Sequence, residues 1–200
     1  MTGAAMEIEA FYDVSSPYTY LAFTRLFGIA ERFGAKLKLL PVYLGGIFKA
    51  LDRTLPHLSK LTYMQKDLND WASFLSVPLK FPRVFPLNSI HVQRGAVWMK
   101  DRGLEEDYLK RVFPAYWVED RDLSKDDELS EIVKSLGVDP YAFFQGIRSE
   151  EIKQKLKEIT EVALGRGVFG VPTFFVEGEM FWGNDRLLFV EHKLESSKHS

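Results

Sequence analysis

Cysteine is absent from this chain of 200 residues. The protein therefore cannot form a disulfide, bind a metal ion through thiolate ligands or use a thiol nucleophile of its own. Any thiol chemistry that it performs must use a sulfur atom that a ligand brings.

Long apolar runs and an excess of charge are absent as well. No 18 successive residues are apolar, and the first residues show neither the basic nor the apolar segment of a secretory signal, so we expect a cytoplasmic protein with no membrane partner. A net charge of −2 without a lysine- or arginine-rich run argues against nucleic acid as a partner. The histidines form no pair at i,i+4 spacing and accompany no carboxylate motif, so we expect no metal site; they are His57, His91, His192 and His199.

The composition is that of an ordinary globular protein, with 46% hydrophobic and 27% charged residues. A chain of this length fits one domain, or one domain that carries a large insertion. It can bury enough apolar surface to fold without a metal ion or a disulfide.

Residues 11–20, FYDVSSPYTY, join a predicted strand to a predicted helix. Apolar and acidic residues alternate over residues 6–10, and apolar residues recur at helical spacing from residue 21 to residue 33. Ser16 falls at the turn, where its hydroxyl can cap the helix, and Pro17 suits the first helical position. Because N–H groups at a helix start can also hold an anion, Ser16 is either a cap alone or part of a binding site.

The rest of the chain has a clear order of elements. A second strand at residues 36–43 completes a βαβ unit, whose right-handed crossover makes the two strands parallel. Ser149 starts a long helix over residues 150–164, and two strands around the turn Glu177-Gly178 and a helix from Leu187 follow. Further helices are predicted at residues 45–51, 60–76, 89–102 and 105–118, after a cap at Asp122 or Ser124, and from Asp139-Pro140.

This order predicts an α/β fold, in which a four-stranded mixed sheet with helices on its faces is interrupted by an all-helical insertion. We place the sheet domain at residues 1–44 and 148–200 and the insertion at residues 45–147. The large apolar residues of the insertion are expected in a core, with a peptide groove or a substrate pocket as alternatives; they include Phe81, Phe85, Trp98 and Trp117.

Two motifs precede the third strand. Residues 165–170, GRGVFG, match the pattern G-x-G-x-x-G but follow a helix and precede a strand, the reverse of the order that dinucleotide binding requires. We interpret these glycines as a helix end and a bend. Pro172 directly precedes the strand, where a cis peptide could expose backbone groups towards a ligand, although a trans peptide is more common.

A third motif, WGNDR at residues 182–186, lies at a strand-to-helix junction. Asp185 can accept hydrogen bonds from an ammonium group, and the N–H groups of the helix start can receive a carboxylate. In the alternative, Asn184 or Asp185 only caps the helix and Arg186 forms a surface ion pair.

Taken together, these motifs resemble the 2-hydroxychromene-2-carboxylate isomerase family, which is allied to kappa-class glutathione transferases and DsbA-type oxidoreductases. The resemblance extends over most of the chain and is carried by residues 11–18, 63–68, 85–89, 169–175 and 181–187. It implies a thioredoxin-like fold with a DsbA-like helical insertion, bound glutathione, a homodimer and a cis peptide at Pro172.

The resemblance also implies a role for each matching residue. Ser16 stands where DsbA-like proteins carry a cysteine; it would be the catalytic residue and would stabilise the thiolate of glutathione, since a helix N-terminus lowers the pKa of a thiol. Val171 would pair through its backbone with the cysteinyl part of glutathione, and Pro172 would also belong to the cofactor-binding residues. The γ-glutamyl end would be held by Trp182, Gly183, Asn184, Asp185 and Arg186. The small aromatic substrate would contact Lys49, Asn88 and Ser89.

The implied activity is the glutathione-dependent interconversion of 2-hydroxychromene-2-carboxylate and trans-o-hydroxybenzylidenepyruvate in aromatic catabolism. The sulfur of glutathione would add to the substrate, permit rotation about the former double bond and leave again. Two alternatives share the fold: a kappa-class-like glutathione transferase or peroxidase, and a non-enzymatic, peptide-binding DsbA-like protein.

One segment departs from the family pattern. After residues 45–50, relatives usually show a Gly-Asn pair near the substrate pocket, whereas this chain has Leu51-Asp52-Arg53. A charged pair in place of a small residue and an amide is expected to change the size and polarity of the pocket.

Overall fold

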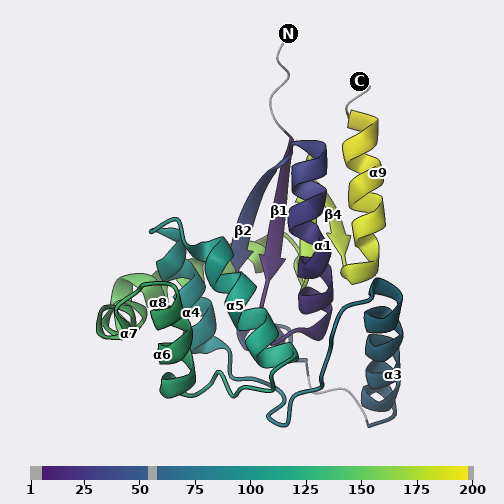
Figure 1. Ribbon diagram of the computed structural model, residues 1–200. Helices are drawn as coiled ribbons and strands as arrows, with labels where there is room; N and C mark the ends of the chain where they lie inside the picture. Colours follow the sequence, from purple (N-terminus) through teal and green to yellow (C-terminus); the bar gives the residue numbers. More distant parts are fainter. Residues whose placement is uncertain (1–5, 54–57, 198–200) are drawn as a thin grey trace.

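A four-stranded mixed sheet lies at the centre of the fold (Figure 1). In this computed structural model, which describes residues 6–53 and 58–197, the strand order is β2-β1-β3-β4. The strands are β1 (Glu7–Tyr12), β2 (Lys36–Pro41), β3 (Thr173–Val176) and β4 (Glu179–Trp182). β1 pairs in parallel with β2 and antiparallel with β3, which pairs antiparallel with β4. The mixed sheet that the sequence predicts is confirmed.

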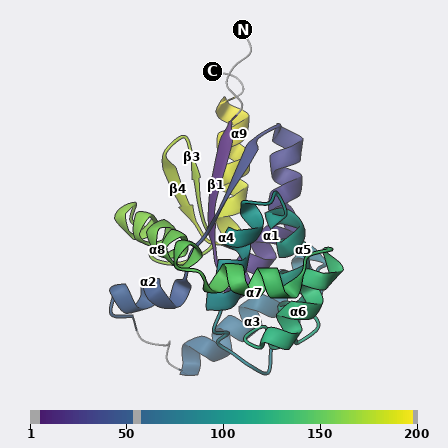
Figure 2. The same cartoon turned by 90° about the vertical axis from the view of Figure 1, so that its left-hand side faces the viewer.

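Side chains of β1 alternate between two faces of the sheet. Ile8, Ala10 and Tyr12 are fully buried in the larger core, together with apolar residues of α1 (Pro17–Phe33) and α9 (Leu187–Ser197), which lie side by side along the sheet (Figure 1). Phe11 belongs instead to a smaller core with Ala163 of α8 (Glu150–Gly165). Helix α8 packs against β2 and lies next to the short helix α2 (Leu44–Ala50) (Figure 2).

The other helices lie between α2 and α8 in the sequence. They are α3 (Leu58–Leu75), α4 (Ile90–Lys100), α5 (Glu105–Trp117), α6 (Asp126–Ser135) and α7 (Pro140–Arg148). α3 packs against α1, apart from the group formed by α4, α5, α6 and α7 (Figure 1). These positions confirm the helical character predicted for this part of the chain.

Most of the predicted helix starts are confirmed. Ser16, Asp139 and Ser149 each accept a hydrogen bond from a backbone N–H of the helix that they precede. The predicted cap of α6 is wrong, because this helix begins at Asp126 and its N-cap residue is Lys125. Asp122 Oδ1 accepts hydrogen bonds from Ser124 N at 3.2 Å and Ser124 Oγ at 2.6 Å, so these two polar side chains close a turn before the helix.

Buried hydrogen bonds join α4 and α5 to the sheet. Gln93 Nε2 donates to the carbonyl oxygens of Tyr12 and Val42, at 2.9 Å each, and its Oε1 accepts from Val14 N at 3.3 Å. Trp117 Nε1 donates to Val14 O at 2.8 Å. Trp98 and Trp117 are buried in the same core as β1 and α1, which confirms their predicted core position. The division into two domains stays a prediction.

Candidate active site

Ser16 lies at the junction of β1 and α1, as the sequence predicts, and only 5% of its surface is exposed. Its Oγ accepts a hydrogen bond from Thr19 N at 3.3 Å and therefore caps α1. The same hydroxyl donates to the carbonyl oxygen of Val171 at 3.0 Å. Ser16 thus also joins the start of α1 to the segment before β3.

That segment contains the cis peptide Val171-Pro172, which confirms the expectation from the resemblance. The carbonyl oxygen of Pro172 accepts a hydrogen bond from Gly183 N at 3.0 Å. A second cis peptide, Phe85-Pro86, was not predicted. It lies in the proline-containing loop after α3, and both of its residues line the cavity described next.

A cavity of about 310 Å³ opens beside Ser16. Its polar part is formed by Ser15, Ser16 and Val171. The apolar walls come from α2, α3, the loop after α3 and β4, and include Phe48, Met64, Phe85 and Trp182. Among the described residues that line the cavity, two are cationic, Arg53 and Lys60, and none is acidic. The cavity therefore suits a ligand that is partly aromatic or apolar and partly anionic.

The glycines of residues 165–170 shape the approach to this cavity. α8 ends at Gly165, and Gly167 has a φ of +82°, in the left-handed region that favours glycine. A Cβ atom on Gly170 would lie 2.9 Å from Nε1 of Trp182. Trp182 is 47% exposed and packs edge to face on Phe169, with 4.6 Å between ring centroids. These glycines end a helix and turn the chain, as we interpreted them, and Gly170 in addition leaves room for the indole ring.

Residues 182–186 are only partly brought to the cavity. Its lining includes Trp182 but not Asn184, Asp185 or Arg186. Asn184 is buried, and Arg25 Nη2 donates to its carbonyl oxygen at 2.9 Å and to its Oδ1 at 3.0 Å, while its Nδ2 has no hydrogen-bond partner among the described residues. Asp185 and Arg186 are half exposed and form an ion pair at 3.5 Å. The γ-glutamyl site assigned to this segment stays a prediction.

The residues predicted to contact substrate do not line the cavity. Lys49 is exposed on α2, and Asn88 is exposed with its Oδ1 accepting from Ile90 N at 3.4 Å. Ser89 is buried, and its Oγ donates to Oδ2 of Asp13 at 2.9 Å. The structure therefore brings together Ser16, Val171 and Trp182, and the substrate contacts of the other three residues remain predictions.

Asp13 is a buried residue of this region that the sequence reasoning missed. Its carboxylate accepts from Ser15 N and Leu44 N at 2.8 Å each, in addition to Ser89 Oγ. Burial raises the pKa of the Asp13 carboxyl above its usual range, against the lowering effect of these hydrogen bonds. An acidic residue at the apolar end of a strand, three positions before Ser16, was the available signal.

Tyr18 is a second residue that sequence reasoning missed. It lines the cavity, and its hydroxyl donates to Oδ2 of Asp67 on α3 at 2.7 Å. Burial and the neighbouring Asp67 carboxylate raise the pKa of the Tyr18 phenol, which keeps it a hydrogen-bond donor at neutral pH. Tyr18 and Asp67 both belong to motifs that carry the family resemblance, but their spacing in the sequence does not reveal that the two side chains touch.

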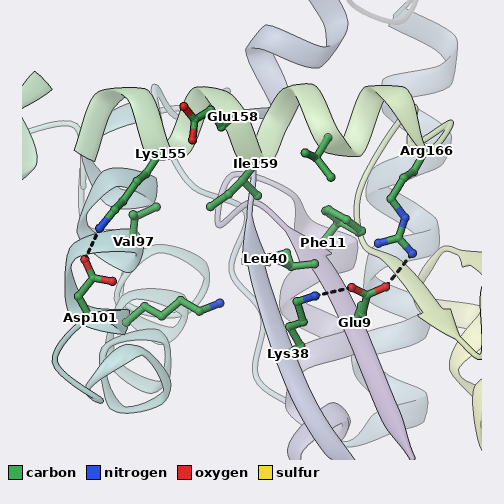
Figure 3. Close-up of a pocket in the computed structure, with 12 residues that line it drawn as sticks. Glu9, Phe11, Lys38, Leu40, Val97, Asp101, Lys155, Glu158, Ile159 and Arg166 are labelled. Atoms are coloured by element: carbon green, nitrogen blue, oxygen red, sulfur yellow. Dashed lines mark hydrogen bonds and ion pairs between the residues drawn. The ribbon is translucent and has the colours of Figure 1, made fainter. Parts of the chain in front are cut away.

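A second cavity, of about 350 Å³, lies between α8, α4 and the strands β1 and β2 (Figure 3). Several of its charged groups pair with one another: Lys38 and Arg166 bind Glu9 at 2.8 and 2.7 Å, and Lys155 binds Asp101 at 2.8 Å. None of the residues that sequence analysis singled out for binding lines it. We therefore place the candidate site at the cavity beside Ser16.

The described part of the chain lacks two features, a cluster of potential metal ligands and a membrane-spanning helix. No group of three or more histidine, cysteine, aspartate or glutamate side chains there could hold a metal ion, and His57 and His199 lie outside the described residues. Over the same residues, no helix combines the length and the hydropathy that crossing a membrane requires.

Known proteins resemble this chain in sequence and in structure. Residues 7–195 match the family described as DSBA-like thioredoxin domain. A 2-hydroxychromene-2-carboxylate isomerase from Pseudomonas sp. (strain C18) is 31% identical over 189 residues, which cover 92% of this chain and 88% of that protein. Glutathione S-transferase kappa 1 from Rattus norvegicus is 29% identical over 212 residues, covering 97% of this chain and 93% of that protein. A solved structure of 2-hydroxychromene-2-carboxylate isomerase superposes with a TM-score of 0.88 at 30% identity and covers 98% of this chain and 100% of that chain.

Proposed function

Because this chain belongs to the 2-hydroxychromene-2-carboxylate isomerase family of DsbA-like thioredoxin domains, we propose that it is a glutathione-dependent isomerase. Its substrate pair would be 2-hydroxychromene-2-carboxylate and trans-o-hydroxybenzylidenepyruvate. One observation carries this proposal: the Ser16 hydroxyl lies at the start of α1, 3.0 Å from the carbonyl oxygen of the residue before cis-Pro172, in a chain without cysteine.

The residues at this site fit glutathione as a cofactor. Glutathione is an anionic tripeptide with a thiol, and the cavity combines Ser16 at a helix start with two cationic side chains and no acidic one among its described lining residues. Positive charge and a helix N-terminus both favour the thiolate over the thiol. Trp182 and the backbone of Val171 adjoin the same space. The chain could therefore hold the cofactor with its sulfur near Ser16.

The Ser16 hydroxyl would act as a hydrogen-bond donor to the cofactor. It has one proton, which it uses in the hydrogen bond that it donates to the carbonyl oxygen of Val171. If Ser16 donates that proton to a thiolate instead, the Val171 carbonyl becomes free to accept a backbone N–H of the tripeptide. Its Oγ can keep the cap of α1 meanwhile, because Thr19 N donates to a lone pair and not to the hydroxyl proton. When bound, glutathione supplies a thiolate that adds to the substrate and later leaves.

Residues 182–186 are proposed to hold the γ-glutamyl end of glutathione. Asp185 offers a half-exposed carboxylate for the ammonium group, and Arg186 adds a cation beside it. Asn184 keeps an amide N–H₂ without a partner in residues 6–53 and 58–197, on a side chain that Arg25 holds in place. For the aromatic substrate, Phe48 and Phe85 supply flat apolar walls, and Lys49, Asn88 and Ser89 remain the positions that the resemblance assigns to it.

The cellular setting belongs to the same proposal. We place the protein in the cytoplasm, in the breakdown of aromatic compounds, and as a homodimer that takes a small aromatic substrate and neither nucleic acid nor a membrane. Cell fractionation and light scattering after size exclusion chromatography would test the location and the dimer.

The direct test is to incubate the protein with 2-hydroxychromene-2-carboxylate, with and without glutathione, and to follow the product by chromatography and mass spectrometry. We expect a product of unchanged mass that forms only with glutathione. The proposal fails if the substrate equilibrates no faster with the complete mixture than with buffer and glutathione alone.

A kappa-class-like transferase or peroxidase is the second candidate, because the rat kappa-class relative matches nearly the whole chain. Such an enzyme would use the same sulfur site but release a glutathione conjugate or oxidised glutathione. A product whose mass includes the tripeptide would favour this second function over isomerisation.

A further inference from the structure

Asp52 and Arg53, where the chain departs from its family pattern, adopt a specific geometry at the end of α2. Asp52 has a φ of +49°, in the left-handed region where glycine is favoured and aspartate is tolerated. The backbone can therefore keep the turn that a glycine would make. The turn leaves Arg53 among the residues that line the cavity beside Ser16.

Three groups hold the guanidinium of Arg53 in place. Its Nη1 donates to the carbonyl oxygen of Phe169 at 2.8 Å. Its central carbon lies 5.8 Å from the ring centroid of Phe48 and 5.8 Å from that of Phe169, within the range of a cation–π contact. Since a guanidinium has five N–H donors, this arrangement orients the group and leaves donors for a ligand.

Arg53 has no acidic partner in residues 6–53 and 58–197, and neither has Lys60, the other cation of the cavity. The cavity between α8 and the sheet differs, because Glu9 there binds both Lys38 and Arg166 (Figure 3). These two cations and the helix start place positive charge at the cavity near Ser16, next to the Asp67 carboxylate that Tyr18 binds. A carboxylate would be attracted to this positive charge and could form a bidentate pair with Arg53.

We infer that Arg53, assisted by Lys60, binds the carboxylate of an aromatic acid in the cavity beside Ser16. The ligand is aromatic because Phe48 and Phe169 flank the guanidinium, and because Phe85 and Trp182 form other walls of the same space. Arg53 is thereby a specificity-determining residue, which selects acids over their neutral analogues. This inference rests on the proposed function for the identity of the site and of its carboxylate substrates, and it adds the residue that recognises their carboxylate.

Binding of trans-cinnamate and of the neutral cinnamamide, measured by isothermal titration calorimetry, tests the inference without requiring turnover. We expect the wild-type protein to bind the acid roughly tenfold more tightly than the amide, with a preference that weakens as salt is added. Arg53→Gln keeps an amide that can donate to the Phe169 carbonyl oxygen but removes the charge, and it should lose most of the preference for the acid, since only Lys60 then remains as a cation of the cavity. Arg111→Gln, at an exposed arginine of α5 away from the cavity, is the matched control and should keep the wild-type preference.

The inference is overturned if the wild-type protein binds the two probes equally, or if Arg53→Gln keeps the full wild-type preference for the acid. It is also overturned if Arg53→Gln weakens glutathione binding but not cinnamate binding, because Arg53 would then bind the glycyl carboxylate of glutathione. Glutathione glycyl monoethyl ester, which lacks that carboxylate, identifies this case when its binding is measured beside that of glutathione. A protein that prefers cinnamate through Arg53 but catalyses no isomerisation would contradict the proposed function and leave this inference standing.

Discussion

The hydroxyl of Tyr18, in the first turn of α1, donates a hydrogen bond to Asp67 Oδ2 on α3 at 2.7 Å. This bond joins the helix that begins beside Ser16 to the helix that supplies Lys60 and Met64 to the cavity wall. Because α3 packs against α1 (Figure 1), we expect the position of that wall to depend on this contact.

Tyr18→Phe removes the hydrogen bond and keeps the ring. We expect the free energy of unfolding to fall by about 1 kcal/mol and the dissociation constant for glutathione to rise by about threefold to tenfold, as measured by urea denaturation and calorimetry. Tyr141→Phe is the control, since Tyr141 is 73% exposed on α7 and should change neither quantity. An unchanged dissociation constant in Tyr18→Phe would show that the bond does not position the wall.

Ser16→Ala separates capping from catalysis. Loss of the cap should cost about 0.5–2 kcal/mol of stability, whereas loss of the donor to the thiolate should raise the thiol pKa of bound glutathione and lower turnover by about 100-fold. Ser149→Ala removes a serine cap of the same kind, whose Oγ accepts from Ile152 N at 3.3 Å at the start of α8. The control should show the loss of stability with normal turnover. If both variants lose equal activity, Ser16 has no role beyond folding.

Glu105 makes the stability of the fold depend on pH. Burial raises the pKa of its carboxyl from 4.5 to about 7, with Lys100 acting in the opposite direction. The folded protein therefore binds more protons than the unfolded chain between about pH 4.5 and 7, and stability falls as the pH rises through this window. The raised pKa of Glu105 changes the free energy of unfolding by roughly 3 kcal/mol at most across this window.

Glu105→Gln should remove this slope from the pH dependence of the unfolding free energy, because the amide oxygen can still accept from Tyr12, which donates to Glu105 Oε1 at 2.9 Å. Relative to the wild-type protein, the variant should gain stability above pH 7. Glu106→Gln, at an exposed neighbour paired with Lys110, should retain the slope. If the unfolding free energies of the wild type and Glu105→Gln change with pH in parallel, Glu105 is not the source of the pH dependence.

Gly146 on α7 is required by the packing of Trp98. A Cβ atom at this glycine would lie 1.8 Å from Nε1 of Trp98, which is buried in the core. We expect Gly146→Ala to lower the unfolding free energy by about 3 kcal/mol in a denaturant titration, since overpacking forces a core ring to move. Gly28→Ala on α1 meets no atom within 4 Å and should raise stability by about 0.5–1 kcal/mol. Equal effects of the two substitutions would exclude a steric cause.

Local chemistry made much of this structure predictable from the sequence. Ser16 followed by Pro17 marks a helix start whatever the rest of the chain does, and alternation in residues 6–10 marks a strand. Asp122 and Ser124 show where such reasoning fails, because two residues that can each cap a helix instead bind one another. A propensity states what a side chain can do, and its neighbours decide which option it takes.

Contacts between distant segments were not predictable from the sequence. Asp13 receives hydrogen bonds from Leu44 and Ser89, and Arg53 donates to Phe169 across 116 positions of sequence. No periodicity encodes such pairs, since they follow from how the helices pack on the sheet. The family resemblance named Ser16 and Val171 separately, and the structure adds that they are hydrogen bonded to each other.

Gln93 ties helix α4 to the sheet and to the segment before α1 through three buried hydrogen bonds. One amide on α4 satisfies three backbone groups at the ends of β1 and β2 and at the entry to α1, so pulling the helical block away would leave all three without partners in a dry interior. We therefore expect heat to melt the chain in a single cooperative step, with one calorimetric peak. The two segments of the sheet region, joined by a short linker in place of residues 45–147, should not fold by themselves.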